Sequence, residues 1–173
     1  GQTKDALAKT KAGSWEYDII IPGYKCNMTD IMASIGLVQL DRYPKLLERR
    51  LELVEQYNEG FKGSKVKPLV HNTKDHKSSN HLYITHVEGA TFEQRGEIIT
   101  KMAERGISCN VHYKPLPLLT AYKNLGFDMN DYPNAYSYYV NEVTLPLHTR
   151  LSDEDVDVIV ENFKEVIAEV VGE

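Results

Sequence analysis

The sequence predicts an α+β fold in which a helical segment (residues 1–64) precedes a small C-terminal domain (residues 65–173) with a short, mainly antiparallel sheet backed by helices. Two observations predict it. Apolar residues recur at helical spacing up to residue 63, whereas beyond residue 80 short β-branched and aromatic runs alternate with helical patterns. With 173 residues, 42% of them hydrophobic and 26% charged, the chain has the composition of a soluble globular protein.

The first segment is predicted to contain one strand and two helices. Residues 15–21 have the aromatic and β-branched content of a strand and are followed by a Pro-Gly pair. Residues 27–30 offer N-cap side chains for a short helix over residues 31–40. Pro44 suits the first turn of a second, longer helix that ends near Gly63. This segment has too little surface to bury its apolar stripes alone, so it must pack either on the second part of the chain or on residues outside it.

The C-terminal domain is predicted from alternating strand and helix signals. The expected strands are residues 81–87, 107–113 and 143–147. The expected helices cover residues 91–105, 118–125, 134–141 and a last segment that follows Ser152. Capping boxes formed by Thr91 with Gln94 and by Ser152 with Asp155 begin the first and the last of these helices.

Charge and composition argue against several function classes. The net charge is −5, so there is no electrostatic case for binding nucleic acid or an anionic membrane. No apolar run approaches the about 20 residues that span a bilayer. The two cysteines, Cys26 and Cys109, lie far apart without CxxC spacing. This argues against a zinc site or a disulfide framework and favours a reducing cytoplasm.

The chemically active side chains do not form a recognisable site by spacing. His81 and His86 are five residues apart on an expected strand and would point to opposite faces, so no metal site is predicted. The sequence has no nucleophile elbow of a hydrolase and no Gly-rich loop of Walker or Rossmann spacing. The cluster of Glu48, Arg49 and Arg50 is predicted to be a solvated helix face.

Several motifs go further because they resemble a known family. Residues 23–31 (GYKCNMTDI) and 33–40 (ASIGLVQL) are similar to the Gly-Tyr-Asn-Tyr-Arg-Met-Thr-Asp and Ile-x-Ala-Ala-Leu-Gly-x-x-Gln-Leu signature of the sugar-nucleotide aminotransferases. These are the DegT/StrS group of fold-type I enzymes that depend on pyridoxal 5′-phosphate (PLP). Residues 106–116 (GISCNVHYKPL) resemble the family's Gly-Ile-x-x-x-x-His-Tyr-x-Pro-Leu. The resemblance continues in order through residues 133–156 and covers nearly the whole chain.

The resemblance implies how this chain relates to an intact enzyme. Residues 1–64 would end the PLP-binding large domain and carry interdomain and dimer-interface helices, with a homodimer formed through residues 23–61. The lysine that carries the cofactor in such enzymes lies upstream of the position matching Gly1. Lys4, Lys9 and Lys11 do not stand in a matching context. We therefore expect no catalytic residue in this chain, and no activity from the chain alone.

The resemblance also implies cofactor-binding residues. In such dimers the loop before the first helix reaches across the subunit interface to the PLP phosphate of the partner, which points to Lys25 and Asn27. Lys25 stands where the family usually has Asn, and Asn27 where it usually has Arg. Which of the two meets the phosphate therefore stays open, and a role of Asn27 as a helix N-cap alone is the alternative.

Tyr24, His112 and Tyr113 are the residues that we expect to bind substrate. His112 and Tyr113 stand where the family's small domain faces the sugar nucleotide. The alternative is that Tyr113 is a core residue and His112 a satisfied surface residue. Trp15 and Tyr17 are further candidates for the same cleft, although a buried place in the strand is the favoured interpretation.

The implied activity is transfer of an amino group, through PLP, from an amino acid (glutamate by expectation) to a nucleotide-linked keto-sugar. Such a reaction would serve cytoplasmic synthesis of cell-surface polysaccharide. Two alternatives stay open. One is a keto-deoxysugar dehydratase of the same fold, in which the upstream lysine is a histidine. The other is a non-catalytic ligand-binding domain derived from this half of the fold.

Overall fold

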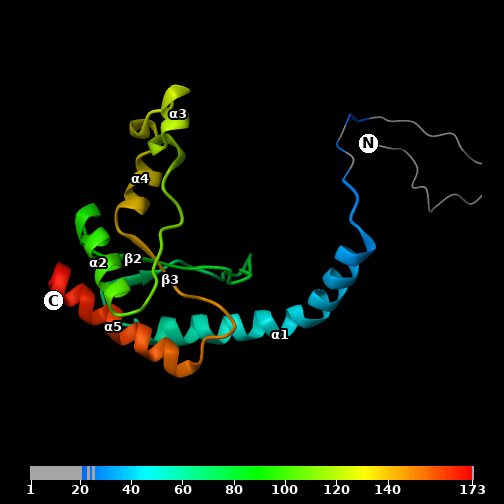
Figure 1. The fold of residues 1–173 in the computed structure, drawn as a ribbon. Coiled ribbons are helices and arrows are strands. Elements are labelled where there is room, and N and C mark those ends of the chain that lie inside the picture. The colour runs from blue at the N-terminus through cyan, green and yellow to red at the C-terminus, as the bar shows by residue number, and fades with distance from the viewer. Residues whose placement is uncertain (1–20, 23, 25, 173) are drawn as a thin grey trace, which may run out of the picture. The chain divides into compact units, whose positions relative to one another are not determined.

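The structure, a computed structural model, describes residues 21, 22, 24 and 26–172 (Figure 1). The chain divides into two units, Gly1–Asp41 and Arg42–Glu173. The strand expected over residues 15–21 lies outside the described residues except for Ile21, and so do Trp15, Tyr17 and Lys25.

Helix α1 covers Asp30–Gly60 and contains the boundary between the two units. Thr29 caps it, because its Oγ1 accepts a hydrogen bond from the backbone N–H of Met32 at 3.3 Å. The two helices expected here are therefore one helix, and Pro44 lies in its interior rather than in a first turn. A proline at this place removes a single backbone donor, and the helix continues on both sides of it.

The second half of α1 packs into the core of the C-terminal unit. The buried side chains of its stripe are Leu53, Val54, Tyr57 and Phe61. Tyr57 stacks on Tyr83 of the sheet with ring centroids 4.6 Å apart. Beyond residue 52 the sheet and the last helix bury this stripe, so the second part of the chain is its packing partner there, and packing outside the small domain is wrong for these residues.

Helices α2 (Phe92–Glu104) and α5 (Asp153–Val171) pack against each other and supply much of the remaining core. Their buried apolar side chains include Ile98, Met102, Val156, Ile159, Val160, Phe163, Val166 and Ile167. Each helix begins with the expected capping box, at Thr91 with Gln94 and at Ser152 with Asp155.

A three-stranded antiparallel sheet lies against these helices, as the sequence predicts. Its order is β1 (Val66–Pro68), β2 (Tyr83–Val87), β3 (Glu142–Leu145). The strand expected over residues 107–113 is reduced to one bridge, in which Asn110 exchanges both backbone hydrogen bonds with Thr144. Local β propensity was misleading here because the segment meets β3 at this one residue pair only.

A segment of short helices follows the bridge and lies on the side of the sheet away from α5 (Figure 1). Its elements are η2 (Leu116–Leu118), α3 (Thr120–Asn124), η3 (Met129–Asp131) and α4 (Pro133–Val140). This segment places α4 over the outer face of β2 and β3.

The arginine pair of α1 is not the solvated face that the sequence predicts. Arg49 Nη2 donates to the Leu151 carbonyl at 2.9 Å and to Asp153 Oδ1 at 2.8 Å. Arg50 Nη1 donates to the carbonyl oxygens of Asn80, His81 and Leu147. Both side chains are half-buried, because they satisfy loop carbonyl groups that run beside the helix.

Candidate functional site

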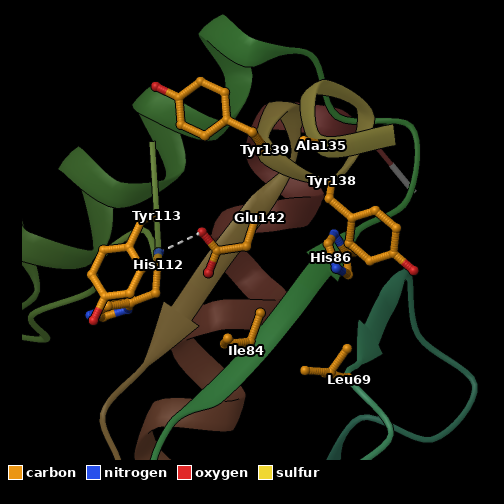
Figure 2. Close-up of a pocket in the computed structure, with 9 residues that line it drawn as sticks. All are labelled: Leu69, Ile84, His86, His112, Tyr113, Ala135, Tyr138, Tyr139 and Glu142. Atoms are coloured by element: carbon orange, nitrogen blue, oxygen red, sulfur yellow. Dashed lines mark hydrogen bonds between the residues drawn. The ribbon is translucent and has the colours of Figure 1, made fainter. Parts of the chain in front are cut away.

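A cavity of about 230 Å³ lies between the outer face of the sheet and α4 (Figure 2). Its floor includes Leu69 and Ile84, and the α4 side chains Ala135, Tyr138 and Tyr139 form one side. Its polar side chains are His86, His112, Tyr113 and Glu142. An aromatic-walled hollow with a few polar groups has the composition of a small-molecule site.

The alternation of β2 gives the cavity its floor. Tyr83, Thr85 and Val87 are buried in the core, so Ile84 and His86 point to the other face of the sheet. His86 Nδ1 lies 3.2 Å from Asn141 Oδ1, whereas its Nε2 is buried without a partner among the described residues. The rings of His86 and Tyr138 form a T-shaped pair with centroids 4.7 Å apart. In the sequence His86 was considered only as a metal ligand, and that role was rejected. Its part in the cavity could not be predicted, because its neighbours Tyr138 and Asn141 are distant in sequence.

His112 and Tyr113 line the cavity together, held by the single bridge to β3. Asn110 N donates to the Thr144 carbonyl at 3.0 Å, and two residues later His112 N donates to Glu142 Oε2 at 3.0 Å (Figure 2). Tyr113 is 74% exposed, so the alternative of a core tyrosine is wrong. Its ring stands edge-on to that of His112 with centroids 4.7 Å apart.

Glu142 is the polar group that the sequence did not reveal as part of this site. It is only 4% exposed at the start of β3, where every residue is buried. One carboxyl oxygen accepts the His112 backbone N–H, and the other accepts the hydroxyl of Thr144. The available signal was a charged residue, Glu142, directly before an apolar run. That pattern does not predict which groups the carboxyl group contacts.

Arg95 of α2 contacts Tyr139, one of the residues that line the cavity. It is 4% exposed, and its guanidinium carbon lies 4.7 Å from the ring centroids of both Phe92 and Tyr139. Such cation–π contacts attach α4 to α2. The position of Tyr139 in the cavity therefore depends on α2, a helix that contributes no residue to the cavity lining.

The loop expected to bind cofactor belongs to the first unit and is described only in part. Tyr24 is 99% exposed, and Asn27 is exposed as well. Thr29, and not Asn27, caps α1, so the Asn27 amide is not used in the cap. An amide and the backbone N–H groups of a first helical turn are donors that suit a phosphate group, so the described part of this loop fits PLP in its chemistry.

Within the described ranges no group of three His, Cys, Asp or Glu residues is placed to hold a metal ion. None of the helices in that part of the chain combines the length and the apolarity needed to cross a bilayer. Cys26 is exposed and Cys109 is half-buried, and both are free thiols.

The fold of this chain matches part of the fold of solved sugar aminotransferases. Spr1654 from Streptococcus pneumoniae, described as a sugar aminotransferase and solved in its PMP-form, has 66% sequence identity and superposes with a TM-score of 0.85. The match covers 98% of this chain and 43% of that chain. The chain belongs to the DegT/DnrJ/EryC1/StrS aminotransferase family, whose model matches residues 4–164.

Curated relatives agree with this assignment. The spore coat polysaccharide biosynthesis protein SpsC of Bacillus subtilis is 36% identical over 90% of this chain and 41% of its own length. A UDP-4-amino-4,6-dideoxy-N-acetyl-β-L-altrosamine transaminase of Helicobacter pylori is 31% identical over 84% of this chain and 39% of its own length. The chain thus spans about two fifths of the length of these relatives.

Proposed function

We propose that this chain is the C-terminal portion of an aminotransferase that moves an amino group from an amino acid, glutamate in our expectation, to a nucleotide-linked keto-sugar. The observation that carries the proposal is the cavity in which His112 and Tyr113 meet the outer face of the sheet, in a chain of the sugar aminotransferase family. One relative is described as a transaminase of a UDP-linked amino sugar, which supports the substrate class. His112, Tyr113 and the exposed Tyr24 are the proposed substrate-binding residues.

PLP is the proposed cofactor, supported by solved PLP- and PMP-forms of the pneumococcal relative. When bound, PLP supplies the electron sink that lets an amino group pass between two carbon skeletons. Lys25 and Asn27 would hold its phosphate, and residues 1–64 would end the domain that binds it. Lys4, Lys9 and Lys11 do not stand in the family's context for the lysine that carries PLP, so we propose that the chain alone does not transaminate.

A homodimer formed through residues 23–61 is the proposed assembly. The first half of α1 and the loop before it carry large apolar side chains that are exposed in the single chain. These are Tyr24, Met28, Ile31, Met32, Ile35, Leu37, Val38, Leu40 and Tyr43. Apolar groups in such number are typical of surfaces that another chain or domain covers. We place the dimer in the cytoplasm, where nucleotide-linked sugars are made.

Activity of the chain should be tested both alone and joined to the N-terminal part of the pneumococcal relative, with PLP, glutamate and a UDP-linked 4-keto-sugar. The joined protein is expected to form an amino sugar and 2-oxoglutarate, and the chain alone neither. In the joined protein, Tyr113→Ala should raise KM for the sugar, while Tyr122→Ala, outside the cavity, should not. Sugar binding without any turnover would identify a ligand-binding domain.

A further inference from the structure

We propose that Glu142 and Thr144 are positioning residues that hold the His112 imidazole in its Nδ1–H tautomer. Nε2 then accepts a hydrogen bond from a hydroxyl or N–H group of the molecule in the cavity. This deepens the proposed function and rests on it for the identity of the ligand, since the hydroxyl groups of a nucleotide-linked sugar are donors of this class. It also predicts that an anionic group is disfavoured at this atom, because a lone pair would face its charge.

Both carboxyl oxygens of Glu142 accept a hydrogen bond. Its Oε2 lies 3.0 Å from the backbone N of His112, which can only donate. Its Oε1 accepts the hydroxyl proton of Thr144. Glu142 as a residue is only 4% exposed, so little water competes for these two bonds.

The hydroxyl group of Thr144 has one proton and can donate only one hydrogen bond. Thr144 Oγ1 also lies 3.0 Å from His112 Nδ1, and its proton is already given to Glu142. Oγ1 can therefore only accept from the ring, which requires a proton on Nδ1. In the neutral imidazole Nε2 then carries the lone pair, and it has no hydrogen-bond partner among the described residues.

Glu142→Gln should reverse this chain of hydrogen bonds. The His112 backbone N–H needs an acceptor, and the amide oxygen of Gln is the only one in its side chain. The amide NH₂ would then face Thr144 and donate to its Oγ1. The hydroxyl proton would turn to His112 Nδ1, so the ring proton would move to Nε2. A substitution of almost identical shape thus converts the proposed acceptor into a donor.

The test is two-dimensional ¹H–¹⁵N correlation of histidine side chains in the ¹⁵N-histidine-labelled chain, with the His112 signals assigned by their loss in His112→Ala. Spectra are recorded at about pH 8.5, about two units above the ordinary imidazole pKa of ~6.5. The Nδ1–H pattern is expected in the unsubstituted chain and in Thr144→Ser, which keeps the hydroxyl. The Nε2–H form is expected to gain population in Glu142→Gln and in Thr144→Val, which has the same shape but no hydroxyl.

An Nε2–H ring, a tautomer mixture or an imidazolium in the unsubstituted chain would overturn the proposal. So would an unchanged tautomer in Thr144→Val. If Glu142→Gln does not fold, the Thr144→Ser and Thr144→Val pair decides the matter. Addition of UDP-N-acetylglucosamine is a separate readout: a shift of the Nε2 signal supports the hydroxyl contact, and saturation of other cavity signals without that shift argues against it. Because the tautomer needs no ligand, its outcome stands even if the proposed function fails.

Discussion

Arg50 Nη1 donates to the carbonyl oxygen of Asn80 at 3.1 Å and so connects α1 to the loop that leads into β2. The same nitrogen reaches the carbonyl groups of His81, at 3.1 Å, and Leu147, at 3.3 Å. One guanidinium group therefore fixes the ends of two loops that flank the sheet. Its loss would leave partly buried carbonyl oxygens without donors.

We predict that Arg50→Met lowers the free energy of unfolding by about 2 kcal/mol, the range for hydrogen bonds that involve a charged group. The measurement is chemical denaturation followed by circular dichroism. Arg42→Met is the matched control, since Arg42 is exposed on the same helix without a hydrogen bond to a described residue, and it should change stability by less than about 0.5 kcal/mol. Equal losses in the two variants would show that the Arg50 contacts contribute nothing.

Gly60 should not tolerate alanine, although alanine favours helices. A Cβ at Gly60 would lie 2.8 Å from Cγ1 of Val160 in α5, and the branched Val160 side chain is buried in the core. We expect Gly60→Ala to lower the unfolding free energy by about 1–2 kcal/mol after the helix-propensity gain. Gly96→Ala, in α2 with nothing within 4 Å of its Cβ, should raise it by about 0.5–1 kcal/mol. A second change, Val160→Ala, should make Gly60→Ala less harmful, and strictly additive effects would contradict the clash.

His71 should make the stability depend on pH in the acidic range. Its ring stacks on Tyr83 with centroids 5.9 Å apart, and burial lowers its pKa. Between the lowered pKa and the ordinary value of ~6.5, the unfolded chain binds more protons than the folded one. The free energy of unfolding should therefore fall as the pH drops below ~6.5, and fall less in His71→Gln. Parallel pH curves for the two proteins would argue against this.

The two cysteines should react very differently with iodoacetamide. Burial raises the pKa of the Cys109 thiol to about 12, whereas Cys26 is exposed. Because the thiolate is the reactive form, we expect Cys26 to be alkylated quickly at about pH 8 and Cys109 only after unfolding. Mass spectrometry of the native Cys26→Ser variant should show almost no modification. Rapid labelling of that variant would mean that the core opens around Cys109.

Local signals predicted the elements whose stabilising contacts are themselves local. The Thr91–Gln94 and Ser152–Asp155 capping boxes join residues three positions apart, so the sequence alone showed where α2 and α5 begin. The strand expected over residues 107–113 depended on a distant partner, and the structure pairs only Asn110 with β3. Strand propensity cannot tell how many residues of a distant strand a segment will meet.

Only part of the candidate site was predicted, because some of its residues belong to a local motif and others come together only through strand pairing. His112 and Tyr113 were found through their motif, and the structure places both at the cavity. His86 and Glu142 were not assigned to the site because their neighbourhood arises from the pairing of β2 with β3, across more than 50 residues. Tyr139 lines the cavity and is held there by Arg95, which also contacts Phe92 of α2. These contacts join distant residues, so no local sequence pattern predicts them.

The sequence by itself determined the family, the capped helices and the antiparallel α+β domain, because motifs, caps and hydrophobic periodicity are properties of neighbouring residues. Only the tertiary structure decided that the stripe of α1 is buried beside the sheet and that Arg50 holds two loops. It alone showed that Glu142 and Thr144 surround the ring and backbone of His112. The physical reason is that hydrogen-bond direction and burial depend on groups brought together by folding, and their distances along the chain carry no local signal.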